Sequence, residues 1–190
     1  VAPVAANTPD LLAQMEALRD PTSGLILNKY KDPQEAIKGV GHAVTMAKES
    51  FQKRDAAQIT NIRKGAYVLS EAANGKPQAI IIATGSEVGL AMDAQKALAQ
   101  DGVHVRVVSM PCTNLFDRQD QSYKDSVLTK GVKRVAVEAG VTGFWHKYVG
   151  LEGAVVGMDC FGESAPAGEL FKHFGFTTDN VVATVKKTIA

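Results

Sequence analysis

The turn Gly85-Ser86-Glu87 carries residue types that suit the binding of an anion. It follows an apolar run at 79–83, which predicts a buried strand, and it opens a helix predicted from Glu87 to about residue 100. Free backbone N–H groups at the start of a helix can hold a phosphate or another small anion. Ser86 can instead cap the helix, which is the simpler interpretation, and the Glu87 carboxylate would repel an anion. The turn is a candidate anion site, with helix capping as the alternative.

Glu138 is a second candidate for chemistry, because it directly follows an apolar strand predicted at 134–137. The carboxyl edge of a parallel sheet is where open α/β folds bind their ligands. Glu138 could act there as a general acid or base if its pKa were raised. We favour the alternative in which it pairs with a backbone amide or a basic group and fixes the loop.

The remaining reactive residue types form no recognisable site. None of the histidines has metal-ligand spacing to a second histidine, a cysteine or a carboxylate. The serines that end strands or lie in loops have no neighbouring base, and a Gly-x-Ser-x-Gly motif is missing. The histidines and these serines are His42, His104, His146, His173, Ser109 and Ser164.

The composition excludes several classes of protein. The net charge is +1, from 21 basic and 20 acidic side chains, so no nucleic-acid partner is expected. No apolar run reaches the ~20 residues that cross a bilayer, so no membrane association is expected either. Cys112 and Cys160 cannot form a disulfide framework. We expect both to be buried and reduced, which favours a cytoplasmic protein.

From residue 66 onward, strands alternate with helices. This order predicts a three-layer α/β/α domain with a five-stranded, mostly parallel sheet. The first strand should be antiparallel at one edge, because a turn at 74–77 suggests a hairpin with the next strand. The predicted strands are at 66–69, 79–83, 103–110, 134–137 and 154–158, and the predicted helices at 87–100, 120–128, 142–149, 167–174 and 179–189.

Residues 1–50 differ in pattern from residues 51–190. Helical periods at 10–19 and 33–51 predict a mostly helical segment, weakened by Gly39 and Gly41. We therefore expect a domain at 51–190, preceded by an N-terminal extension or the remnant of another domain.

Six sequence blocks along 51–190 resemble, in order and spacing, the C-terminal domain of bacterial transketolases. They are Gly-Ala-Tyr-Val-Leu at 65–69, Ile-Ala-Thr-Gly-Ser-Glu-Val at 82–88, Val-Val-Ser-Met-Pro at 107–111, Val-Ala-Val-Glu-Ala-Gly at 135–140, Trp-His-Lys-Tyr-Val-Gly at 145–150 and Phe-Gly-Glu-Ser-Ala-Pro at 161–166. The resemblance implies the same three-layer fold. It also implies transfer of a two-carbon ketol unit between sugar phosphates of the pentose phosphate pathway, by a homodimer that uses thiamine diphosphate and Mg²⁺.

The resemblance also implies that the catalytic centre lies in other domains. The family's activating glutamate, its substrate histidines and its Gly-Asp-Gly…Asn metal signature are not recognisable in this sequence. We therefore expect that this chain alone holds neither thiamine diphosphate nor Mg²⁺. The stretch 19–29 faintly resembles the last strand of the preceding domain, where Lys29 would replace an arginine that grips sugar phosphate.

By the same resemblance, the carboxyl edge of the sheet should lie close to the rest of the dimer. The candidate interface residues are Glu138, Trp145, His146, Tyr148, Glu163 and Ser164. The leading hypothesis is an assembly domain of a transketolase-type transferase, inactive alone, which supports the dimer and the catalytic domains. The alternatives are a free-standing regulatory module that binds an anion or nucleotide, and the non-catalytic subunit of a split transketolase.

Overall fold

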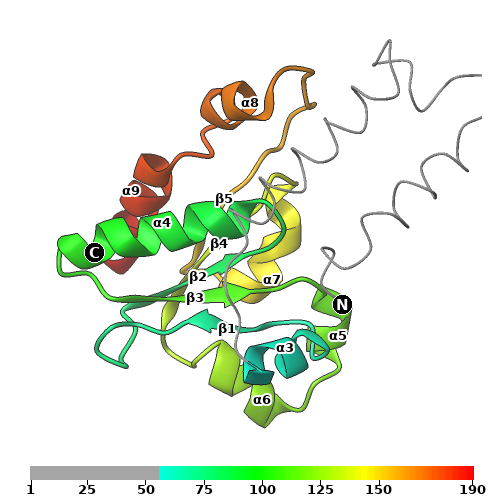
Figure 1. The fold of residues 1–190 in the computed structure, drawn as a ribbon, viewed down its shortest axis with the longest axis vertical. Coiled ribbons are helices and arrows are strands. Elements are labelled where there is room, and N and C mark those ends of the chain that lie inside the picture. Colours follow the sequence, from blue (N-terminus) through cyan, green and yellow to red (C-terminus); the bar gives the residue numbers. More distant parts are fainter. Residues whose placement is uncertain (1–55) are drawn as a thin grey trace, which may run out of the picture. The chain divides into compact units, whose positions relative to one another are not determined.

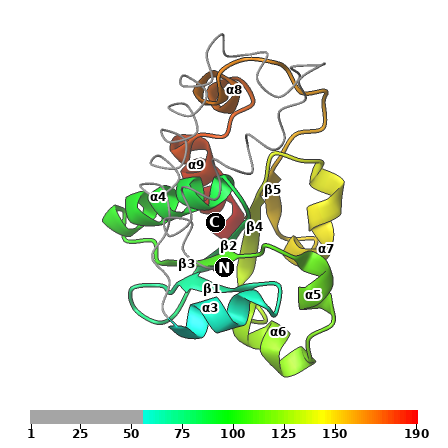
Figure 2. The ribbon, with the colours of Figure 1, turned by 45° about the vertical axis from the view of Figure 1, so that its right-hand side comes forward.

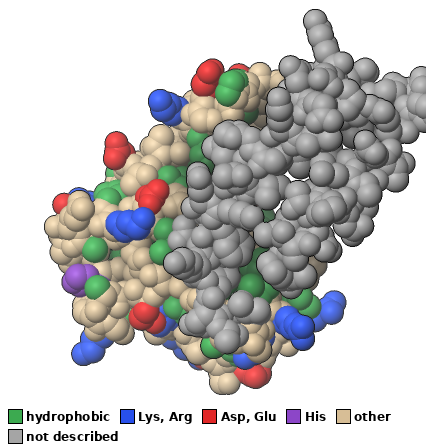
Figure 3. Space-filling model, viewed as in Figure 1, with side chains coloured by type: hydrophobic (Ala, Val, Ile, Leu, Met, Phe, Trp, Pro, Cys, Tyr) green, Lys and Arg blue, Asp and Glu red, His purple; other side chains and the backbone are tan. Residues whose placement is uncertain are grey.

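The computed structural model describes residues 56–190. The helices predicted at 10–19 and 33–51, and Lys29, lie outside the described residues. Among the residues described, no helix is long and apolar enough to cross a membrane. On the face seen in Figure 3, basic and acidic side chains are interspersed rather than gathered by sign.

Five strands form one sheet in the order β1-β3-β2-β4-β5. Strands β2, β3, β4 and β5 run parallel, and β1 pairs with β3 in the antiparallel sense. The predicted mostly parallel, five-stranded sheet with one antiparallel edge strand is confirmed. The strands are β1 (Tyr67–Ser70), β2 (Ala79–Ala83), β3 (Val105–Ser109), β4 (Lys133–Val137) and β5 (Ala154–Val156).

The predicted hairpin between the first two strands is wrong. β1 pairs with β3, and β2 lies on the other side of β3. The turn at 74–77 therefore carries the chain past β3 instead of joining neighbours. Residues on both faces of β2 and β3 are buried, since these strands lie inside the sheet.

Helices cover both faces of the sheet (Figures 1 and 2). Alternate residues of β2 divide between two cores: Ile81 packs in the core that includes residues of α4 and α9, while Ile80 and Ile82 pack in the core with α5, α6 and α7. Fully burying such side chains contributes roughly 1.5–3 kcal/mol each, which explains the unbroken apolar run. The helices are α3 (Ala56–Ile62), α4 (Glu87–Gln100), α5 (Thr113–Asp117), α6 (Gln121–Val127), η2 (Thr142–Trp145), α7 (His146–Val149), α8 (Ala167–His173) and α9 (Thr178–Ile189).

Two further expectations need correction. Cys112 is partly exposed and Cys160 is exposed, both as free thiols, because each lies in a loop that follows a strand rather than in the core. The short helices α3 and α5 were not expected, since a helix of five to seven residues has too few turns to show a period.

Gly65 fixes where β1 begins. Its φ is +91°, and a Cβ atom at this position would lie 2.2 Å from the Cys112 carbonyl oxygen. The Cys112 N–H donates a 3.0 Å hydrogen bond to the Gly65 carbonyl. This close approach holds the loop after β3 against the start of β1.

Candidate functional site

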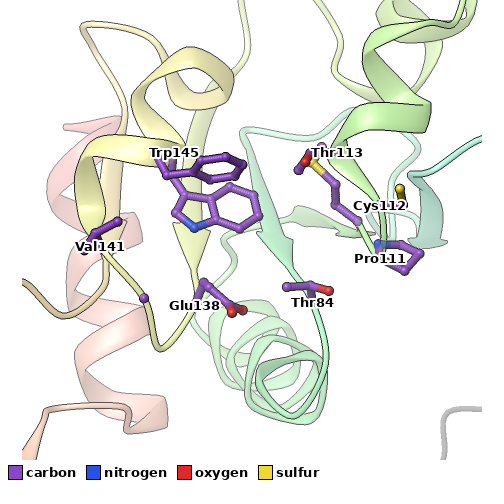
Figure 4. Close-up of a pocket in the computed structure, with 10 residues that line it drawn as sticks. Thr84, Pro111, Cys112, Thr113, Glu138, Val141 and Trp145 are labelled. Carbon is purple, nitrogen blue, oxygen red and sulfur yellow. The ribbon is translucent and has the colours of Figure 1, made fainter. Parts of the chain in front are cut away.

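A cavity of about 440 Å³ lies at the carboxyl edge of the sheet (Figure 4). Its walls come from the loops that follow β2, β3 and β4, and from η2. The lining residues are Thr84, Met110, Pro111, Cys112, Thr113, Glu138, Gly140, Val141, Phe144 and Trp145. A volume of this size is typical of a site for a small molecule or a large side chain.

Strand register brings these loops together. Ala83, the last residue of β2, is aligned with Ser109 at the end of β3 and with Val137 at the end of β4. Thr84 and Glu138 therefore leave two neighbouring strands at the same level. Figure 4 shows them facing each other below the indole ring of Trp145. This is the edge at which open parallel sheets bind ligands.

Glu138 is the acidic residue in the cavity wall. Its Oε2 is buried and accepts no hydrogen bond, while its backbone N–H donates to the Val156 carbonyl at 3.1 Å. Burial raises the pKa of Glu138 to about 7, with further contributions from the charge of Glu87 and from a hydrogen bond between the two carboxyls. A neighbouring carboxyl disfavours the ionised form of Glu138, in the same direction as burial.

Glu87 opens α4 and is only 3% exposed. Its Oε1 accepts a 3.1 Å hydrogen bond from the Ser86 hydroxyl, and its backbone N–H donates to the Thr84 carbonyl at 3.2 Å. Ser86 occupies the N-cap position, but its side chain makes no capping bond. Its expected capping role is wrong, because its hydroxyl serves the glutamate carboxylate instead.

The predicted anion site at Gly85, Ser86 and Glu87 stays a prediction. Gly85 and Ser86 are exposed, and neither lines the cavity. The hydrogen bond between the Glu87 and Glu138 side chains brings two carboxyl groups close together at this turn. Such a pair disfavours an anion and favours a ligand that donates hydrogen bonds or carries positive charge.

Aromatic side chains form the opposite wall of the cavity. Trp145 is 4% exposed and packs edge-on against Phe144, with 5.5 Å between the ring centroids. Phe144 and Val141 remain 53% and 62% exposed. Sequence reasoning had selected Trp145 but missed Phe144, Val141 and Thr84. The signal available for Val141 and Phe144 was that this apolar pair flanks Thr142-Gly143 shortly after a strand end.

The predicted interface residues do not all meet at the cavity. Glu138 and Trp145 line it, while Tyr148 is buried behind it and its hydroxyl lies 3.2 Å from both oxygens of the Asp117 carboxylate. His146 is exposed. Glu163 and Ser164 are exposed in the loop before α8, where Glu163 lies 3.7 Å from His173 Nε2. Their interface roles stay predictions.

Known proteins match this fold and sequence closely. Residues 65–177, more than half of the chain, match the transketolase-like TK C-terminal domain family. Transketolase 2 of Aliivibrio fischeri is 56% identical over 140 residues, and transketolase 1 of Escherichia coli is 58% identical over 139 residues. Each alignment covers 73% of this chain and 21% of the relative, so the chain spans about a fifth of the length of these proteins.

Solved structures agree. Transketolase from Leishmania mexicana superposes with a TM-score of 0.64 and 48% identity, over 69% of this chain and 19% of that one. A structure described as a split gene transketolase, inactive beta4 tetramer, matches with a TM-score of 0.50 and 27% identity, over 67% of this chain and 43% of that one. The sheet, its edge strand and the blocks at its carboxyl edge thus correspond to the C-terminal domain of transketolases, and the chain belongs to that family.

Proposed function

We propose that this chain is the C-terminal assembly domain of a transketolase. In this role it supports the homodimer and positions catalytic domains that transfer a two-carbon ketol unit between sugar phosphates. The boundaries expected from sequence, with the domain at 51–190 and residues 1–50 as an extension or remnant, belong to this proposal, as does a cytoplasmic location. Catalysis depends on precise placement, so a remote support can change a rate by about 10²-fold when it shifts the site by 1 Å.

The charge of the cavity is the observation that carries the proposal. Thiamine diphosphate would bring a strongly negative diphosphate, which needs basic groups, backbone N–H groups or a cation. The cavity at the ligand-binding edge of this sheet presents Glu138 instead, next to buried Glu87. The described residues therefore do not fit the cofactor, and we derive no catalytic step from them. Thiamine diphosphate and Mg²⁺ belong, in this proposal, to other parts of the enzyme.

A reconstitution experiment tests the proposal. The chain alone, supplied with thiamine diphosphate, Mg²⁺ and sugar phosphates, should show no ketol transfer. A chimera in which residues 51–190 replace the matching segment of Aliivibrio fischeri transketolase 2 should dimerise and be active, because the two segments are 56% identical over 140 residues. Turnover by the chain alone, or a chimera that stays monomeric and inactive, contradicts the proposal.

A split enzyme is the second candidate. The segment that aligns with this chain makes up 43% of the split gene transketolase chain, but only 19% of the Leishmania enzyme. This fold therefore also occurs in a chain that carries less sequence outside it. In that case the chain would be a non-catalytic subunit that binds its catalytic partner without a covalent link. A pull-down with the chain as bait should then recover a separate thiamine-binding polypeptide, whereas the first candidate predicts none.

A further inference from the structure

The carboxyl pair at the cavity lacks a positive partner among the described residues. Glu138 Oε2 is buried and accepts no hydrogen bond, although Glu138 lines an open cavity. Within residues 56–190, no lysine, arginine or histidine lines this cavity. A buried carboxylate oxygen without a donor destabilises a protein, because that oxygen has lost its hydration and accepts no hydrogen bond in return.

The walls of the cavity suit the shape of a guanidinium group. The indole of Trp145 extends over the space next to Glu138 (Figure 4). The ring of Phe144 packs edge-on against that indole. A planar cation can stack on an aromatic face while its N–H groups reach a carboxylate. The Thr84 and Thr113 side chains add small polar groups to the lining. The volume of about 440 Å³ leaves room for the guanidinium and its aliphatic stem.

We propose that this cavity receives an arginine side chain presented by the catalytic part of the transketolase, with Glu138 as its ion-pair partner. This inference rests on the proposed assembly function and adds the chemistry of the contact. Two observations identify the occupant. The cavity is acidic, and the relatives extend over a length roughly five times that of the matching segment, which leaves a large surface outside this chain to supply a basic partner. Exposed Val141 and Phe144 supply an apolar rim that excludes water from such a pair.

Docking of a cation has a consequence for protonation. Burial and the neighbouring Glu87 raise the pKa of the free Glu138 carboxyl to about 7, whereas an arginine beside Glu138 favours its ionised form. Docking therefore releases a proton below about pH 7, and affinity falls as the pH drops. The titratable group that contacts Glu138 is Glu87, from the start of α4, and Cys112 is the other titratable residue in the described lining of the cavity.

The first test uses the 190-residue chain and methylguanidinium chloride as a probe. The indole N–H resonance of Trp145, the one tryptophan of the chain, should shift in a saturable manner, with a dissociation constant on the order of 10 mM. Tetramethylammonium chloride at equal concentration should not reproduce the shift. Glu138→Gln should weaken the response about fivefold or more, while Glu169→Gln, at an exposed glutamate of α8, should leave it unchanged. A response that is absent up to about 100 mM, or independent of Glu138, overturns the proposal.

The second test uses the Aliivibrio fischeri chimera and the carboxyl ¹³C resonance of Glu138. In the assembled chimera the pKa of Glu138 should fall below about 5. A value that stays near 7 in an active dimer overturns this inference and leaves the assembly function intact. A chimera that fails to assemble contradicts the assembly function, and the methylguanidinium titration then decides the cavity's preference by itself.

Discussion

Glu87 and Glu138 belong to different elements, 51 positions apart in the sequence, yet their carboxyl groups are hydrogen-bonded to each other. Glu87 is the first residue of α4 and Glu138 directly follows β4. The helix that follows β2 and the end of β4 meet because β2 and β4 are neighbours in the sheet. The pairing raises the pKa of Glu138 to about 7, with burial as the larger cause.

The first prediction concerns the pH dependence of stability. Folded Glu138 has a pKa of about 7 against an ordinary value of 4.5. Between these pH values the folded state retains a proton that the unfolded state has released, so the free energy of unfolding falls as the pH rises through this window. Because solvent reaches part of this side chain and screens it, the loss should be on the order of 1 kcal/mol.

Glu138→Gln should remove this dependence and raise the free energy of unfolding at about pH 8 relative to the native chain. Urea unfolding across a pH series measures both effects. Glu169→Gln serves as the control, since Glu169 is exposed on α8. Identical pH profiles for the native chain and Glu138→Gln would show that folded Glu138 does not retain a proton in this window.

The second prediction concerns Arg106, which joins β3 to the end of α6. Its guanidinium donates to both oxygens of Glu71, at 2.7–3.1 Å, and to the carbonyls of Ser126 and Val127 at 2.8 and 3.0 Å. Burial by itself raises the pKa of Glu71, but the hydrogen bonds from Arg106 and Ala72 N–H and the charge of Arg106 outweigh it, so the pKa is lowered.

Arg106→Lys should lower the free energy of unfolding by about 2–3 kcal/mol, because lysine cannot span the carboxylate and the helix end at once. The midpoint of urea unfolding near neutral pH measures this loss. Lys130→Ala is the matched control. It breaks the exposed pair with Asp125 and should cost less than about 1 kcal/mol. Equal losses for the two variants would contradict the structural role of Arg106.

The layers of the fold could be predicted from sequence, and the neighbours within the sheet could not. Apolar runs such as that of β2 indicate a strand buried on both faces, and their alternation with helices indicates a parallel sheet. No local sequence pattern indicates that β1 pairs with β3, because strand pairing is a contact between segments that are distant in the sequence. The hairpin expectation failed for this reason.

For the candidate site, the sequence predicted individual residues but not the contact between them. The sequence pattern indicated that Glu138 follows a strand and that Glu87 begins a helix. It also indicated that both lie at the carboxyl edge of the sheet. Their partnership depends on the adjacency of β2 and β4, which sequence periodicity does not encode. Ser86 was expected to cap α4, but a neighbouring buried carboxylate competes for its hydroxyl.

The third prediction separates backbone strain from steric clash at two glycines. Both Gly65 and Gly75 have positive φ, at +91° and +68°. A Cβ at Gly65 would lie 2.2 Å from Cys112 O and 2.3 Å from Phe116 N, whereas a Cβ at Gly75 meets nothing within 4 Å. Gly75→Ala should therefore cost about 1 kcal/mol, and Gly65→Ala at least about 3 kcal/mol.

Thermal unfolding followed by circular dichroism compares the two variants. Gly65→Ala should lower Tm several-fold more than Gly75→Ala, or prevent cooperative folding altogether. Similar shifts in Tm would mean that the loop after β3 relaxes away from Gly65, and that it does not fix the start of β1.

The fourth prediction concerns Phe144, whose ring is 53% exposed at the rim of the cavity. Its edge-on contact with Trp145, at 5.5 Å, stabilises the chain by about 1 kcal/mol at most. If the rim packs against the catalytic part, Phe144→Ser should leave the Tm of the chain within a few degrees of native, since a change of 1 kcal/mol shifts Tm by roughly 2–4 °C in a chain of this length. In the Aliivibrio fischeri chimera it should weaken dimer assembly about tenfold, because an aromatic anchor at an interface often contributes over 1 kcal/mol.

Leu151→Ser is the control, as Leu151 is an exposed apolar residue that does not line the cavity. Sedimentation across a concentration series measures assembly, and equal effects of the two serine variants would place the contact surface away from the cavity.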